Sequence, residues 1–202
     1  MALVILELCS SQNDVAVRKV ERRYGVAARS ARFMFHRFRE TMSHDDGKMF
    51  DGNVVADEVY IGGNAVFMHA NKRHGHAGAG TDKTPVVTLT NTESREARST
   101  IVSWIDSASL GDIIRENVDI ATTFLYTDSR RGDIPVNRTM AGHHAVNHRT
   151  YVDATNKTIG SNLCENYFAR LKRGLKGTHI HVGPRTCTAT WVSLTFDSAH
   201  VT

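Results

Sequence analysis

Cysteine and proline are both scarce in this chain of 202 residues, which has three of each. The cysteines, Cys9, Cys164 and Cys187, form no paired CxxC motif, which argues against a disulfide framework and against a zinc ribbon. The apolar start, MALVILELC, is too short to span a bilayer and lacks the basic lead and cleavage site of a signal peptide. We therefore expect no membrane association and a reducing, cytoplasmic location.

The composition is that of an ordinary globular protein, with 41% hydrophobic and 23% charged residues. A chain of this length can hold one full catalytic domain and a small appendage, but not two large domains. The formal net charge of +4 is compatible with a polyanionic partner without identifying one.

Positive charge is concentrated between residues 15 and 42, which carry eight Lys or Arg against two acidic residues. The segment NDVAVRKVERRYG predicts a helix that Asn13 can cap and Gly25 can end. A second helix is predicted over residues 28–42, with one apolar face. The opposite face of this helix carries Arg29, Arg32, His36 and Arg39.

Two helices across a tight glycine-containing turn predict a helix-turn-helix within residues 1–45. Its basic face is either a DNA contact or simply the solvated side of an amphipathic helix. Basic groups at this spacing, with no acid between them, favour DNA contact.

The acidic spacer HDDGKMFDG, residues 44–52, predicts a boundary before a second domain over residues 46–202. Within that domain we expect strands at 54–61, 84–92, 97–106, 122–128 and 143–148, and helices at 109–118 and 161–176. This order predicts an α/β fold in which helices pack on a mixed sheet.

Three carboxylates fall at informative places: Asp57 in the first strand, Asp128 at the end of the fourth, and Glu165 near the start of the long helix. Such a set can hold two divalent cations about 4 Å apart for an in-line phosphoryl displacement. Magnesium prefers these hard oxygen ligands. Lys172 shares a helix face with Glu165 and could hold a phosphate as a point charge. Among 21 acidic residues, however, three do not identify a site.

Four segments, in this order, carry a family resemblance: DEVYIGG (57–63), YTD (126–128), VNH (146–148) and NLCENYFARLKRGLKGTHIHV (162–182). Together they resemble the DDE transposases of bacterial insertion sequences, specifically the ISXO-like group. The resemblance covers roughly residues 54–184.

The resemblance implies a ribonuclease-H-like mixed sheet flanked by helices and preceded by a small helix-turn-helix. It also implies that Asp57, Asp128 and Glu165 are the catalytic acids and the ligands of Mg²⁺, with Mn²⁺ as a possible substitute. The implied activity is DNA cleavage and strand transfer at insertion-sequence ends. Its DNA-binding residues would be Lys172, Arg173 and His181 together with Arg29, Arg32 and Arg39.

The implied partners are double-stranded DNA, as transposon ends and target, and further copies of the chain in a homodimer or larger assembly. No membrane and no small-molecule cofactor is expected, and the protein would act in the cytoplasm on chromosomal DNA. His181 would lie near phosphate or pack beneath the active site.

The chain departs from the group at both ends and resembles a truncated or decayed copy. Members often begin with a zinc ribbon, and they continue after Pro184 into a charged helix, whereas residues 185–202 form an atypical tail rich in Thr, Ser and Val. Two alternatives therefore stay open: a catalytically inactive remnant that only binds DNA, and a ribonuclease-H-like nuclease without strand transfer.

Other features have ordinary interpretations. Glu58 would point to the opposite face of its strand from Asp57 and is expected to be structural. The histidine pairs 74/76, 143/144 and 179/181 lack cysteine partners, so zinc is not favoured. We expect Gly62–Gly63 to form a turn rather than a phosphate loop. The basic loop 69–83 either follows a DNA backbone or is merely solvated.

Overall fold

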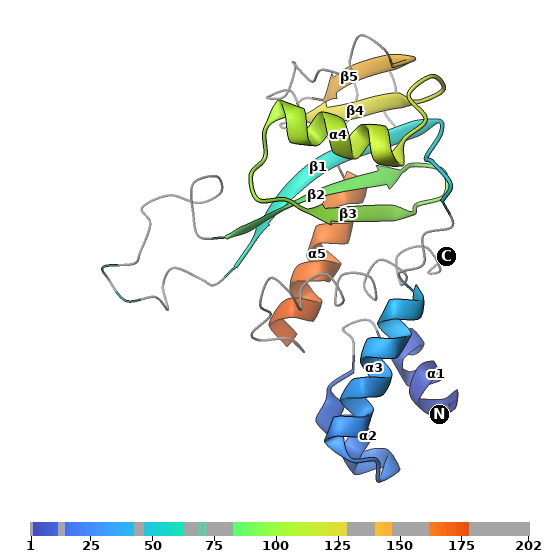
Figure 1. Ribbon diagram of the computed structural model, residues 1–202, viewed down its shortest axis with the longest axis vertical. Helices are drawn as coiled ribbons and strands as arrows, with labels where there is room; N and C mark the ends of the chain where they lie inside the picture. The colour runs from blue at the N-terminus through green and yellow to red at the C-terminus, as the bar shows by residue number, and fades with distance from the viewer. Residues whose placement is uncertain are drawn as a thin grey trace. The chain divides into compact units, whose positions relative to one another are not determined.

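The computed structural model describes residues 2–11, 15–42, 47–62, 69, 71, 83–128, 140–146 and 162–177. Helices and strands follow one another in the order α1, α2, α3, β1, β2, β3, α4, β4, β5 and α5 (Figure 1). The chain divides into two compact units, one of Met1–Gly47 with Glu165–Thr202 and one of Lys48–Cys164. Within the described ranges, no helix is long and apolar enough to cross a membrane.

The unit of residues 48–164 is built on a five-stranded sheet in the order β3-β2-β1-β4-β5. Its strands are β1 (Asn53–Ile61), β2 (Thr84–Asn91), β3 (Ala97–Ile101), β4 (Phe124–Asp128) and β5 (Gly142–Val146). The first three form an antiparallel meander, whereas β4 runs parallel to β1, and β5 runs parallel to β4. The predicted fold class, a mixed α/β sheet with helices packed on it, is confirmed.

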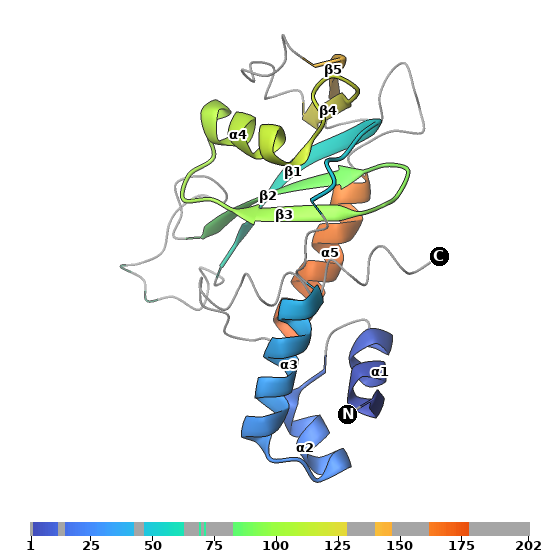
Figure 2. The same ribbon diagram turned by 45° about the vertical axis from the view of Figure 1, so that its right-hand side comes forward.

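Helix α4 (Ser107–Asn117) covers one face of this sheet (Figure 2). Its buried residues Leu110, Ile113 and Ile114 recur at helical spacing and so form one apolar stripe. The stripe packs on alternate strand residues, namely Val54, Ala56, Val87, Leu89 and Leu125. Because side chains alternate between the two faces of a strand, the residues between these positions point to the other face of the sheet.

The start of α4 corrects the predicted length of the preceding strand, which ends at Ile101 rather than at residue 106. Asp106 caps the helix, because its Oδ1 accepts a hydrogen bond of 2.7 Å from the backbone N–H of Ser109. The Ser109 hydroxyl accepts in return from the backbone N–H of Asp106, at 3.1 Å. This reciprocal cap starts the helix at Ser107, two residues before its predicted start.

Gly62 immediately follows β1 and lies next to Lys83, the residue before β2. A Cβ at this position would lie 2.9 Å from Cγ and 3.1 Å from Cα of Lys83. Only a residue without a side chain fits beside that backbone. The expected turn at Gly62–Gly63 stays a prediction. Gly63 lies outside the described residues.

The helices α1 (Ala2–Ser10), α2 (Val17–Tyr24) and α3 (Ala28–Met42) share one small apolar core. Its buried members are Val4, Val15, Val20, Ala31 and Phe35. The left-handed conformation of Gly25, with φ 64°, ends α2 as the sequence predicts. The described helix begins at Val17, and the predicted cap Asn13 lies outside the described residues. The helix α1 was not predicted from the sequence. It contributes Val4 to this core.

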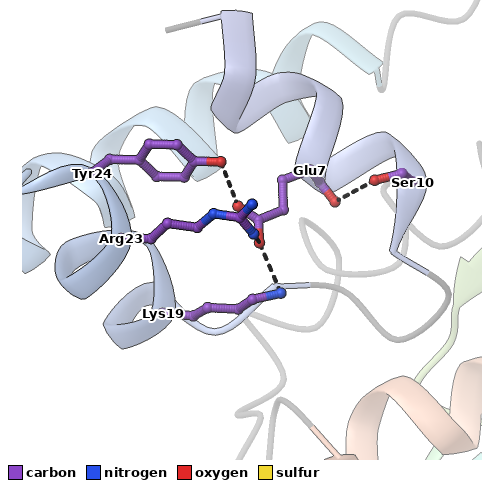
Figure 3. Close-up of polar contacts among 5 residues, drawn as sticks. All are labelled: Glu7, Ser10, Lys19, Arg23 and Tyr24. Carbon is purple, nitrogen blue, oxygen red and sulfur yellow. Dashed lines mark hydrogen bonds and ion pairs between the residues drawn. The ribbon is translucent and has the colours of Figure 1, made fainter.

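A buried carboxylate links α1 to α2 (Figure 3). The side chain of Glu7 is only 11% exposed, and its Oε1 lies 2.7 Å from Nζ of Lys19 and 3.1 Å from a guanidinium nitrogen of Arg23. Its Oε2 accepts a hydrogen bond of 2.8 Å from the Tyr24 hydroxyl. The hydrogen bond from Lys19, followed by that from Tyr24, lowers the pKa of Glu7. The same contact with Glu7 raises the pKa of Tyr24.

Candidate functional site

Asp57 and Asp128 lie side by side on the neighbouring parallel strands β1 and β4. The pairing register matches Ala56 with Thr127, and each aspartate is the next residue along its strand. Neighbouring strands are roughly 4.8 Å apart, and residues at the same level of a parallel pair point to the same face. Ala56 packs toward α4, so both aspartates project from the face opposite α4. Both are partly buried.

Asp57 and Glu58 are neighbours in β1, but their carboxylates lie on opposite faces of the sheet. Glu58 pairs with Val87, which belongs to the core beneath α4, so strand alternation places Glu58 on the α4 face. The backbone N–H of Glu58 donates a hydrogen bond of 2.8 Å to Oδ1 of Asp57. The expectation that Glu58 points away from Asp57 agrees with this register.

Cys164 holds the first turn of α5 (Asn162–Gly177) against the sheet face that carries Asp57. Its buried Sγ lies 3.4 Å from Oγ1 of Thr90 and donates to the backbone oxygen of Val55 over 3.7 Å. Thr90 and Val55 are paired across β2 and β1, and Val55 shares its strand face with Asp57. Glu165 is the residue that follows this anchor.

The rest of α5 has one buried and one exposed face. Tyr167, Phe168 and Leu171 are buried, whereas Lys172 and Arg173 are exposed. Glu165 is partly buried and lies in the first turn, where the helix dipole stabilises a negative charge. Lys172 follows Glu165 by seven residues, which is about two turns, so the two share a face as the sequence predicts.

The structure thus brings Asp57 and Asp128 together in one unit, whereas Glu165 falls in the other. In the part of the chain that is described, no group of three or more His, Cys, Asp and Glu side chains is arranged to hold a metal ion. The membership of Glu165 in the acidic set stays a prediction.

A polar and aromatic layer lies next to Asp128 that sequence reasoning did not find. The His144 ring stacks on Tyr126 with ring centroids 5.3 Å apart, and the Tyr126 hydroxyl donates to Oδ1 of Asn53 at 3.3 Å. On the other face, Nε2 of His143 lies 2.8 Å from Oγ1 of Thr127. Burial, with a smaller effect of His144, lowers the pKa of His143 and favours its neutral ring. These contacts tie β5 to β4 near Asp128.

The layer had a signal in the sequence, because two adjacent histidines follow the strand that ends at Asp128. The sequence places them in the predicted strand 143–148 and does not favour them as zinc ligands. Their observed contacts are a ring stack and a hydroxyl hydrogen bond. Both contacts join β5 to β4 and are structural.

The predicted basic face of α3 is exposed, with Arg29, Arg32 and His36 all open to solvent. Its opposite side contributes Ala31 and Phe35 to the small apolar core. Arg39 falls within α3. The exposed face also carries a residue that sequence reasoning missed, Phe33, which is 65% exposed.

Several predicted features lie outside the described residues. They are His181, the tail 185–202, the histidines 74, 76 and 179, and nearly all of the loop 69–83.

Residues 49–189 match the family of the ISXO2-like transposase domain. No curated protein matches the chain. A solved structure described as the intasome of simian T-cell lymphotropic virus in complex with the PP2A regulatory subunit B56 gamma is similar at 11% identity, with a TM-score of 0.40. That similarity covers 89% of this chain and 61% of the other. The family match includes Asp57, Asp128 and Glu165 and excludes the basic helix α3.

Proposed function

The chain belongs to the ISXO2-like transposase domain family, and we propose that it cuts DNA at insertion-sequence ends and joins the cut ends to target DNA. One observation carries the proposal: Asp57 and Asp128 lie at the same level of adjacent parallel strands, on one face of the sheet. A pair of carboxylates on rigid strands is a suitable base for a phosphoryl-transfer site.

Asp57, Asp128 and Glu165 are the proposed catalytic set and would hold Mg²⁺, with Mn²⁺ as a substitute. The donors fit this ion, because carboxylate oxygens are hard ligands and strand pairing already fixes two of them close together. Held by these residues, two cations would supply Lewis-acid stabilisation of charge, one on the attacking oxygen and one on the leaving oxygen. The contacts of Cys164 support the inclusion of Glu165, because Cys164 immediately precedes Glu165 and is fixed to the sheet face that carries Asp57.

The proposed chemistry has two balanced steps. In the first, a water oxygen bonds to phosphorus at the transposon end while the bond from phosphorus to O3′ breaks. The water loses a proton and the leaving oxygen gains one, which creates a free 3′-hydroxyl. In the second step, this hydroxyl loses its proton and bonds to a target-strand phosphorus, while the bond from that phosphorus to its own O3′ breaks and the leaving O3′ gains a proton. The first step hydrolyses a phosphodiester bond, and the second replaces one phosphodiester bond by another. Neither step involves oxidation or reduction.

The basic residues have separate proposed roles on the DNA. Lys172 and Arg173 are exposed and would bind phosphates of the transposon end, a role also proposed for His181. Arg29, Arg32 and Arg39 of α3 would bind duplex DNA. Because two ends must be joined, we expect a dimer or larger assembly that acts in the cytoplasm on chromosomal DNA.

The test is magnesium-dependent nicking of a labelled duplex that carries the DNA flanking the gene. The variants are Asp57→Asn, Asp128→Asn and Glu165→Gln, which keep side-chain size but remove the charge. Each should reduce nicking by on the order of a hundredfold or more, since each removes charge stabilisation from the transition state. DNA binding, followed on the same duplex by gel shift, should persist.

Glu58→Gln is the matched control, because it removes the neighbouring carboxylate from the opposite face of β1 and should leave nicking unchanged. If Glu165→Gln nicks as well as the parent chain, Glu165 is not the third ligand. The second candidate, a DNA-binding remnant without catalysis, is supported by the exposed basic face of α3. Specific binding without nicking in any divalent metal would favour it.

A further inference from the structure

The solvent-facing arc of α3 holds an exposed aromatic ring among basic side chains. At 100° per residue, the arc runs from Arg32 through His36, Arg29, Glu40 and Phe33 to Arg37. Arg29, Arg32, His36 and Arg37 are exposed, and Phe33 is 65% exposed. The opposite side of the helix is fixed in the core by Ala31 and Phe35. The arc is therefore held in place by packing, and Phe33 lies within it, beside Arg37.

The apolar core does not account for Phe33. Its ring is contacted by the Arg37 guanidinium, whose Cζ lies 5.8 Å from the ring centroid. A cation–π contact at an exposed site is weak, and this one leaves most of the ring in water. An exposed ring among basic side chains can contact a base edge while the cations bind phosphates.

We propose that Phe33 is a sequence-reading contact of α3, and that its ring packs on the 5-methyl group of a thymine in the DNA major groove. This inference rests on the proposed DNA binding by α3. It goes further by assigning base recognition to one side chain. Phenylalanine recognises thymine through its methyl group, which projects into the major groove and is absent from the other bases.

Charge and position both fit this partner. Arg29, Arg32 and Arg37 share the arc with Phe33, and they outnumber Glu40, the one acidic residue of α3. Those arginines complement the phosphates that line the groove, and they would bring the ring to the base edges. Phe33 lies in the first half of α3, the second helix of the pair, and it is this part of a recognition helix that contacts bases.

The experiment selects duplexes from a pool with a randomised centre, using the full chain. In the best-bound duplex, each thymine is then replaced in turn by uracil, which removes only the methyl group. At one or two positions, uracil should weaken binding by the parent chain roughly fourfold, the value of one buried methyl group. Phe33→Ala should lose this discrimination and bind the thymine and uracil duplexes equally, whereas Phe33→Leu should retain part of it.

Trp104→Ala is the matched control, because it removes an aromatic side chain that is 62% exposed in the other unit, and it should keep the discrimination. Circular dichroism checks that α3 is folded in each variant. The proposal is overturned if uracil has no effect at any position, or if Phe33→Ala discriminates like its parent. It is also overturned if Phe33→Ala converts a dimer to a monomer without changing discrimination, because a second copy would then cover the ring. If the pool yields no bound duplex, DNA binding itself fails, and this proposal fails with it.

Discussion

Cys164 and Thr90 meet in the interior, although 74 positions separate them in the chain. Both are buried, and among the described residues the Thr90 hydroxyl hydrogen-bonds with the Cys164 thiol at 3.4 Å. A buried hydroxyl that loses its partner costs free energy, because water cannot replace the bond. The thiol therefore acts as a structural contact within the unit of residues 48–164, and no redox role is needed to explain it.

We expect Cys164→Ala to lower the free energy of unfolding by about 1–3 kcal/mol, because it leaves the Thr90 hydroxyl unpaired and opens a small cavity. Cys164→Ser can still hydrogen-bond to Thr90 and Val55 and should lose less. Urea denaturation of the full chain and both variants measures the difference. Equal losses in the two variants would show that volume, rather than hydrogen bonding, makes Cys164 important.

At the scale of elements, a single charged cluster joins α1 to α2. The cations Lys19 and Arg23 of α2 contact Glu7 of α1 rather than extending the exposed basic face of α3. A second acid, Glu21, has its pKa lowered by the hydrogen bond from Arg18 and also by the backbone N–H of Ala28, at the start of α3. Two carboxylates thus contribute to the stability of the helical pair when they are ionised.

The three helices should therefore lose stability in acid. The pKa of Glu7 is lower in the folded chain than in the unfolded one, so its contribution is present above the unfolded value and is lost as the pH falls through the folded value. Loss begins below about pH 4.5, the ordinary value. Glu7→Gln should lower the melting temperature at pH 7. It should also weaken the fall of the melting temperature with decreasing pH, but some of that fall should remain because Glu21 is still present.

Thermal melts followed by circular dichroism between pH 3 and pH 7 measure this effect. Asp112→Asn is the control, since Asp112 forms an exposed pair with Arg115 within α4 and should not change the melting profile. If Glu7→Gln has the same pH profile as the parent chain, the cluster around Glu7 does not stabilise the helices.

At the scale of the whole molecule, positive charge and acidic chemistry are segregated along the chain. Residues 15–42 carry eight Lys or Arg, and the rest of the sequence is slightly acidic. The paired aspartates lie in the unit of residues 48–164. Under the proposed function, this separation lets affinity for DNA be altered without touching the catalytic carboxylates.

Replacing Arg29, Arg32 and Arg39 together by Ala should weaken duplex binding broadly, across all sequences. Each lost phosphate contact should reduce the slope of log affinity against log salt by about one, so the triple variant should lose about three. Fluorescence anisotropy over a salt series measures the slope, with Arg115→Ala as a single-charge control in the other unit. An unchanged slope in the triple variant would mean that this face of α3 is only solvated.

Much of the fold followed from local patterns in the sequence. The strands β1, β2 and β4 and the helices α3 and α5 were predicted near their observed bounds, because apolar periodicity is a property of consecutive residues. Gly25 ended α2 as predicted. The family resemblance is confirmed by the match over residues 49–189. The catalytic roles of Asp57, Asp128 and Glu165 and the DNA-binding roles of the basic residues stay predictions.

Other features required the tertiary structure. Whether α1 packs depends on Val15, Val20 and Phe35, which lie outside that helix. The order and direction of the strands, which place Asp57 level with Asp128, depend on pairings between residues far apart in the chain. The contact of Cys164 with Thr90 is likewise non-local. The sequence alone determined periodicity, caps and motifs because these act within a few residues, whereas contacts across long loops are decided only when the whole core is packed.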